Sequence, residues 1–156
     1  MTHKEDVNPA WALKELCSAW RNGCINRVIP MLDDQVVFEM QPGADVLPFG
    51  GLAYGIAAVS DRLRMIFAQF ERPLFEEQVV RIDVDETVAR VKFIFVHKAT
   101  REQIKGTFRL IVRYNFAGQI THLTKIHDEE RIRAFMILVA ASAADRGYPE
   151  IDSDDV

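Results

Sequence analysis

The chain contains few of the residues that build disulfide frameworks and metal centres: it has two cysteines and four histidines in 156 residues. Cys17 and Cys24 lie seven positions apart on an expected helical segment. We therefore interpret them as buried thiols rather than a disulfide, which suits a reducing compartment. The histidines show neither HxH nor HExxH spacing. The sequence therefore predicts no metal site.

A strong charge imbalance and a long apolar run are also missing. The net charge is −4, so we do not expect a nucleic-acid partner. The longest apolar run, Ala134–Ala141, is too short to span a bilayer, and the N-terminal residues lack the apolar centre of a signal peptide. The chain has no phosphate-binding loop, no GxSxG elbow and no dinucleotide fingerprint. We expect a cytoplasmic protein with no membrane partner and no cofactor.

What the chain does contain is an ordered series of helical and strand patterns. Near-helical spacing of apolar residues follows Asn8-Pro9, and Gln35–Gln41 predicts a first strand. The second half predicts a meander of long strands, Thr87–His97, Gln103–Phe116 and Ile120–Ile126. Hydrophobic residues make up 49% of the chain, enough for one core. We divide it into a flexible N-terminus (1–7), one domain (8–145) and an acidic, disordered tail (146–156).

The segments between the first strand and the meander predict a loop, a helix and a further strand. Pro42–Gly55 is rich in glycine and proline and predicts a long loop at the lip of a binding site. An amphipathic helix follows it, Pro73 is expected to stop this helix, and Phe75–Asp83 predicts the next strand. The last helix is apolar on all sides over residues 134–144. Such a helix is usually buried on both sides, so we expect a homodimer.

This order of elements resembles the NTF2-like superfamily, which includes the ketosteroid isomerase and SnoaL-like polyketide cyclase families. The resemblance rests on Leu32-Asp33-Asp34 before the first strand, on Gly55 before the third helix, and on the last strand running into His127-Asp128. It implies an α+β cone, in which a curved antiparallel sheet wraps around the N-terminal helices, leaves a pocket and is followed by a C-terminal helix. Enzymes, binding modules and partner subunits share this fold.

Strand alternation divides the meander into an apolar face, expected to line the pocket, and a basic outer face. The basic face carries Arg90, Lys92, Arg109 and Arg113, interpreted as a solvated or dimer surface. The expected ligand-binding residues are Trp20, Tyr54, Met65, Phe67, Phe93, Phe95, Phe108, Leu110 and Leu123. Tyr54 is the residue of this set that could present a hydroxyl group from the loop.

Three residues are the candidate catalytic groups. By the resemblance, Glu39 takes the place of the isomerase family's catalytic carboxylate, and an apolar cavity would raise the pKa of such a base. Lys125 could polarise a carbonyl oxygen, and His127 titrates near neutrality and could act as an acid or a base. The facing of strand 35–41 stays open, because Val36, Phe38 and Met40 share the face opposite to Glu39.

The sequence departs from the isomerase family at the oxyanion hole. In that family a tyrosine of the first helix and a protonated acid form the oxyanion hole. The expected first helix of this chain has no tyrosine, and Leu110 stands at the position of the acid. A ketosteroid isomerase is therefore not expected.

Three hypotheses follow for a pocket that takes a small apolar molecule. The first is a cofactor-free isomerase, cyclase or dehydratase. The others are a non-catalytic ligand-binding protein and a partner subunit.

Overall fold

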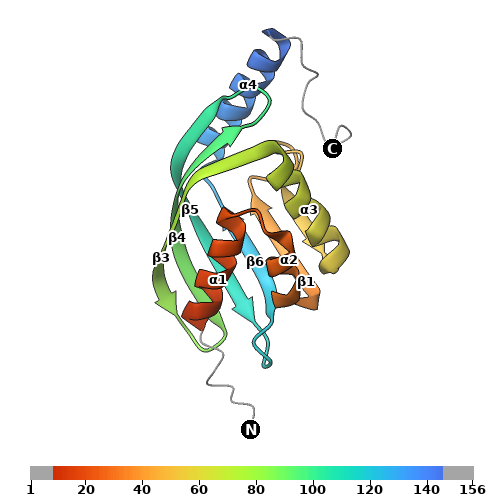
Figure 1. Ribbon diagram of the computed structural model, residues 1–156, viewed down its shortest axis with the longest axis vertical. Helices are drawn as coiled ribbons and strands as arrows, with labels where there is room; N and C mark the ends of the chain where they lie inside the picture. Colours follow the sequence, from red (N-terminus) through yellow and green to blue (C-terminus); the bar gives the residue numbers. More distant parts are fainter. Residues whose placement is uncertain (1–8, 146–156) are drawn as a thin grey trace.

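The computed structural model describes residues 9–145, and the predicted terminal segments 1–7 and 146–156 lie outside this range. The helices are α1 (Pro9–Arg21), α2 (Ile25–Val28), α3 (Gly55–Gln69) and α4 (Glu129–Asp145), with a 3-10 turn at Ile29–Met31 after α2. The strands are β1 (Leu32–Gln41), β2 (Gly51–Tyr54), β3 (Phe70–Ile82), β4 (Glu86–His97), β5 (Gln103–Tyr114) and β6 (Ile120–Ile126). Figure 1 shows one curved sheet with α1 and α3 against the same face.

The described strands form a single sheet in the order β2-β1-β6-β5-β4-β3. Strands β3 to β6 make the predicted antiparallel meander. The predicted antiparallel sheet also contains one parallel pair, because β1 runs parallel to β6. No hairpin connects these two strands, which are separated by about half of the chain, so nothing local imposes an antiparallel order.

Some element boundaries differ from those the sequence predicts. Strand β2 lies inside the predicted loop Pro42–Gly55, where it pairs with β1. Strand β3 begins at Phe70 directly after α3, so Pro73 lies within β3 and does not stop the helix. The pairing of β3 with β4 shifts register between Glu71 and Leu74, around this proline. Proline is tolerated there because β3 is an edge strand and its missing N–H interrupts little pairing.

The core lies between the concave face of the sheet and the helices α1 and α3. Helix α1 contributes Leu13, Leu16 and Trp20, and α3 contributes Val59 and Leu63, all buried. The indole of Trp20 stacks on Phe38 of β1 and Phe75 of β3, with centroid distances of 6.3 and 6.4 Å. The predicted α+β cone, with a curved sheet wrapped around the N-terminal helices, is therefore confirmed.

Helix α4 extends beyond the body of the sheet, beside the turn between β4 and β5 (Figure 1). The Arg131 guanidinium donates a hydrogen bond to the Lys105 carbonyl oxygen, and the Ser142 hydroxyl bonds the Glu102 carboxylate. The helix buries one face, while Ile137 and Leu138 are exposed. The expected burial of its second face by another subunit stays a prediction. None of the helices within residues 9–145 is long and apolar enough to cross a bilayer.

Candidate functional site

A small apolar hollow lies between the concave face of the sheet, α3 and α4; we call it the interior hollow. It encloses about 30 Å³, which is room for one or two water molecules. A larger occupant requires side chains to move, and Met40 and Met136 are the flexible side chains in its wall. Its lining residues are Met40, Leu47, Phe49, Ile66, Phe70, Phe95, Ile104, Lys125, His127, Ile132, Phe135 and Met136.

Lys125 is the charged side chain of this wall, and only 1% of its surface is exposed. Strand β6 directs it inward, because its ladder partners Met40 and Leu110 are both buried on the concave side. Its Nζ lies 4.6 Å from the ring centroids of Trp20 and Phe108 and 5.3 Å from that of Phe95. It has no hydrogen-bond partner among the described residues.

The protonation of Lys125 follows from this environment. Burial, reinforced by the positive charge of Arg72, lowers the pKa of Lys125 from 10.5 to about 7, against a smaller opposing effect of Cys17. An ordinary lysine is fully protonated at neutral pH. A substantial fraction of the Lys125 amine is therefore neutral there and able to accept a proton or attack an electrophile.

His127 follows β6 and lies against the same rings. Its ring centroid is 4.6 Å from that of Phe108 and 5.1 Å from that of Phe93. The backbone N–H of His127 donates to the Gln41 carbonyl oxygen at 2.9 Å, but its Nε2 is buried and unpartnered within the described part of the chain. Burial, followed by the positive charge of Lys125, lowers the pKa of His127 well below 6.5, so the ring is neutral at pH 7.

The neutrality of His127 has a consequence for acid stability. Below pH 6.5 the unfolded chain protonates this histidine while the folded protein does not, so stability falls by up to about 1.4 kcal/mol per pH unit. We expect urea unfolding to show this fall between pH 6.5 and 5.5. His127→Phe keeps the aromatic contacts and should make the fall shallower. His97, whose pKa burial also lowers, contributes to what remains. An unchanged slope in His127→Phe would contradict the buried neutral ring.

Two more buried nitrogen atoms near these groups are unpartnered within residues 9–145: Trp20 Nε1 and Arg72 Nε. Arg72 also lies with its guanidinium carbon 4.6 Å from the Phe67 ring centroid. Indole and guanidinium nitrogens are hydrogen-bond donors, and an unsatisfied buried donor costs stability. A ligand that brings an acceptor oxygen, such as a carbonyl group, would complement this interior.

The structure does not place Glu39 in the interior. Phe38 and Met40 are buried on the concave side, and Glu39 alternates to the outer face, opposite Leu52 of β2 and Thr124 of β6. Its carboxylate accepts a hydrogen bond from Gln41 Nε2 at 3.0 Å. The expectation that Glu39 joins Lys125 and His127 in the pocket is therefore wrong. The reason is the register that β1 adopts against β6.

The predicted ligand wall divides into three groups. Six of its residues are buried on the inside: Trp20, Phe93, Phe95, Phe108, Leu110 and Leu123. Met65 and Phe67 on α3 are half-buried, and the Phe67 ring meets Trp20 edge-on at 5.4 Å. Tyr54 is 65% exposed, because the loop expected at this position is the edge strand β2, from which it points outward. Its placement at the pocket is wrong.

Several residues of the interior hollow are not predicted by the sequence. Leu47 and Phe49 come from the loop before β2, and Ile132, Phe135 and Met136 come from α4. Strand alternation says nothing about loops and helices that fold across a sheet. The apolar residues Leu47 and Phe49, in a segment otherwise typical of a surface loop, are the signal that could have indicated a buried role.

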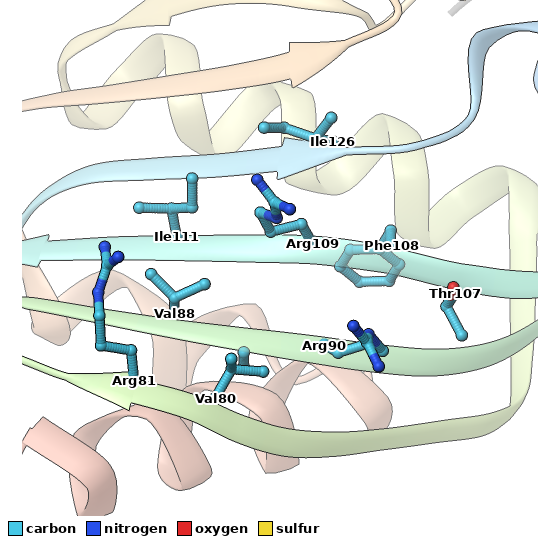
Figure 2. Close-up of a pocket in the computed structure, with 10 residues that line it drawn as sticks. Val80, Arg81, Val88, Arg90, Thr107, Phe108, Arg109, Ile111 and Ile126 are labelled. Atoms are coloured by element: carbon cyan, nitrogen blue, oxygen red, sulfur yellow. The ribbon is translucent and has the colours of Figure 1, made fainter.

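A larger groove of about 560 Å³ lies on the outer face of the sheet, and we call it the outer groove. Figure 2 shows Arg81, Arg90 and Arg109 on neighbouring strands, with Val80 and Val88 between them. Arg90 and Arg109 face each other in the ladder, and neither makes an ion pair within residues 9–145. The predicted basic outer face is confirmed. Its arginine side chains are exposed, whereas Lys125 and His127 are buried.

The other reactive side chains, Cys17 and His97, are buried and have roles in packing or in a turn rather than in a site. Burial, with the charge of Glu77, raises the pKa of Cys17 to about 12, so this thiol is unreactive at neutral pH. His97 Nδ1 bonds the Thr100 hydroxyl at 2.9 Å within the turn after β4. No group of three or more histidine, cysteine or acidic side chains between Pro9 and Asp145 is arranged to hold a metal ion.

The fold and the interior site define the class of protein: an α+β cone whose concave side encloses a small pocket. No protein-family model and no curated protein sequence matches the chain. Solved structures do match it over most of its length, and they show that it has the NTF2-like fold.

Three of these structures illustrate the likeness. A candidate isomerase from Rhodopseudomonas palustris is 20% identical, with a TM-score of 0.72, covering 88% of this chain and 98% of its own. An NTF2-like protein of unknown function from Burkholderia pseudomallei is 13% identical, with a TM-score of 0.71 over 81% and 95%. A candidate polyketide cyclase from Xanthomonas campestris is 15% identical, with a TM-score of 0.64 over 79% and 95%. Identities this low establish the fold alone.

Proposed function

We propose that the interior hollow binds a small apolar compound that carries a carbonyl group, and that the protein transfers a proton at the neighbouring carbon without a cofactor. The observation that carries the proposal is the pair of buried, unpartnered nitrogens, Lys125 Nζ and His127 Nε2, in a wall that is otherwise apolar. Buried polar groups without partners are rare in folded proteins, and a ligand that completes their hydrogen bonding is the explanation that we propose for this pair.

Lys125 is the group best suited to act as the base. A general base works best when its pKa lies near the operating pH, and burial brings Lys125 to about 7. As Lys125 takes the proton, negative charge develops on the carbonyl oxygen. The indole of Trp20 carries an unpartnered N–H, and its ring lies 4.6 Å from Lys125 Nζ, so this N–H is the donor that would stabilise the charge if the carbonyl oxygen reaches it.

The similar structures support this reaction class by analogy only. Two of them carry the names candidate isomerase and candidate polyketide cyclase, and proton transfer next to a carbonyl group is the reaction that we propose for this chain. The acid–base group would differ from the carboxylate that the isomerase family uses, because Glu39 lies on the outer face.

A second candidate function is ligand binding without chemistry, or service as a partner subunit. The small free volume of the interior hollow, about 30 Å³, is an argument against catalysis there, because a catalytic site must admit its substrate. The outer groove, at about 560 Å³, would then be the working surface. A homodimer that covers Ile137 and Leu138 of α4 is compatible with both functions.

The test is hydrogen–deuterium exchange at the α-carbon of a panel of small enolisable ketones, followed by NMR. We expect exchange above the buffer rate with at least one ketone. Glu39→Gln is the matched control: its rate should stay within about twofold of the wild type, because the residue does not reach the hollow. A large loss of exchange rate in Glu39→Gln would mean that Glu39 is the base, and it would contradict the role of Lys125. Absence of exchange with every ketone would favour the second candidate function.

A further inference from the structure

We propose that Lys125 forms a covalent imine with short aliphatic aldehydes that enter the interior hollow. This inference rests on the proposed function of the same site and goes beyond it, because proton transfer alone needs no bond between the protein and its substrate.

The surroundings of Lys125 support a nucleophilic role. Its Nζ is enclosed by the rings of Trp20 and Phe108 at 4.6 Å and makes no hydrogen bond within the described residues. Within residues 9–145, no carboxylate bonds to it and none lines the hollow. An amine in apolar surroundings keeps its lone pair available, and desolvated lysines are the ones that form imines with carbonyl compounds. Its pKa of about 7 is consistent with this state.

The reaction balances with the groups present. The Nζ lone pair attacks the carbonyl carbon, and the π electrons move to the oxygen, which takes a proton. The carbinolamine then loses water as the nitrogen lone pair forms the C=N bond. The two hydrogens of the amine leave with the carbonyl oxygen as that water, so no oxidant or reductant is needed. Once protonated, the imine is a cation, and the faces of Trp20 and Phe108 stabilise a cation at this position.

The hollow indicates the class of substrate. Beside Lys125 and His127 its lining is apolar, so the part of the substrate beyond the carbonyl group is uncharged and aliphatic. The free volume of about 30 Å³ favours a short chain, with Met40 and Met136 as the side chains that can yield. An aldehyde reduces the steric demand at the carbon that Lys125 attacks. The imine also makes the α-hydrogens of the aldehyde more acidic. Because the Lys125 nitrogen is then part of the imine, His127 Nε2 is the group of this wall that would take the α-proton of an aldehyde.

The experiment is reductive trapping in the wild-type protein. Propanal and hexanal are each added at pH 7 with cyanoborohydride, which reduces imines, and alkylated lysines are located by peptide mapping. We expect propanal to alkylate Lys125 at least about tenfold faster than Lys92 and Lys105, which are exposed to solvent rather than enclosed by apolar side chains. Hexanal should react more slowly at Lys125 than propanal. Lys92→Met should leave the labelling of Lys125 unchanged.

The outcomes separate this inference from the proposed function. Alkylation of the exposed lysines with none at Lys125, in protein shown to be folded by circular dichroism, would overturn the imine. If α-carbon exchange still depended on Lys125 in that case, the proposed function would stand with Lys125 as a non-covalent base. Selective alkylation of Lys125 supports the imine whether or not Lys125→Met folds, because the peptide mapping is done on the wild-type protein.

Discussion

Lys125→Met should slow α-carbon exchange of a responsive ketone by about 10²- to 10⁴-fold, the usual contribution of a positioned general base. Methionine is close to lysine in volume and is apolar, so it keeps the contacts with Trp20 and Phe108 while removing the amine. The loss should appear in kcat as well as in kcat/KM, because the amine acts on the reacting carbon. The measurement is the NMR exchange rate at saturating ketone.

Lys92→Met provides the control, because it removes an exposed lysine from the outer face of β4 and leaves the interior unchanged. It should exchange at the wild-type rate. If Lys125→Met exchanged as fast as Lys92→Met, the amine would have no part in the reaction. The alternative of ligand binding without chemistry would then be the better description.

The second large effect is on alkaline stability. Lys125 has a pKa of about 7 in the folded protein and 10.5 as an ordinary lysine, so between these values the unfolded chain binds a proton that the folded protein does not. Stability therefore rises with pH in this window, and the unfolding free energy should increase by about 2 kcal/mol between pH 7 and 9. Above pH 9 the raised pKa of Cys17 acts in the opposite direction. Urea unfolding at pH 7, 8 and 9 measures the change.

Lys125→Met should lose this dependence and be more stable than the wild type at pH 7, because it removes a buried amine that must give up its proton on folding. Lys92→Met should keep the wild-type slope. A flat profile in the wild type would mean that Lys125 retains its ordinary pKa, and both the base and the nucleophile would lose their physical basis.

Local patterns predict the meander well because β4, β5 and β6 pair with their neighbours in sequence. The alternation of Phe93, Phe95 and Phe108 with Arg90 and Arg109 is enough to assign both faces. Strand β1 is different, because its facing depends on a parallel partner about eighty residues away. The residues Val36–Glu39 are compatible with either face of β1 turning inward. The pairing of Met40 with Lys125 shows that the face with Met40 is the inner one.

The same reason explains how much of the site could be predicted. Lys125 lies on β6, whose facing follows from the meander, and His127 directly follows this strand. Both side chains are buried in the wall of the hollow, and their catalytic roles stay predictions. Glu39 was misplaced because the facing of β1 depends on its long-range pairing with β6. Tyr54 was misplaced because the segment predicted as a loop contains strand β2. The contribution of α4 to the hollow, through Phe135 and Met136, depends on how a terminal helix packs, and strand alternation carries no information about it.

The paired arginines of the outer face and the buried lysine respond differently to ionic strength. Arg90 and Arg109 are solvent-exposed neighbours of like charge, so mobile ions reach them and weaken their repulsion within a Debye length of about 10 Å at 0.1 M salt. Lys125 is enclosed by aromatic rings that exclude those ions. Added salt therefore weakens the electrostatic interactions of the outer groove and has little effect on those of the Lys125 amine. A dependence of ligand affinity on salt would place the ligand in the outer groove, and its absence would favour the interior hollow.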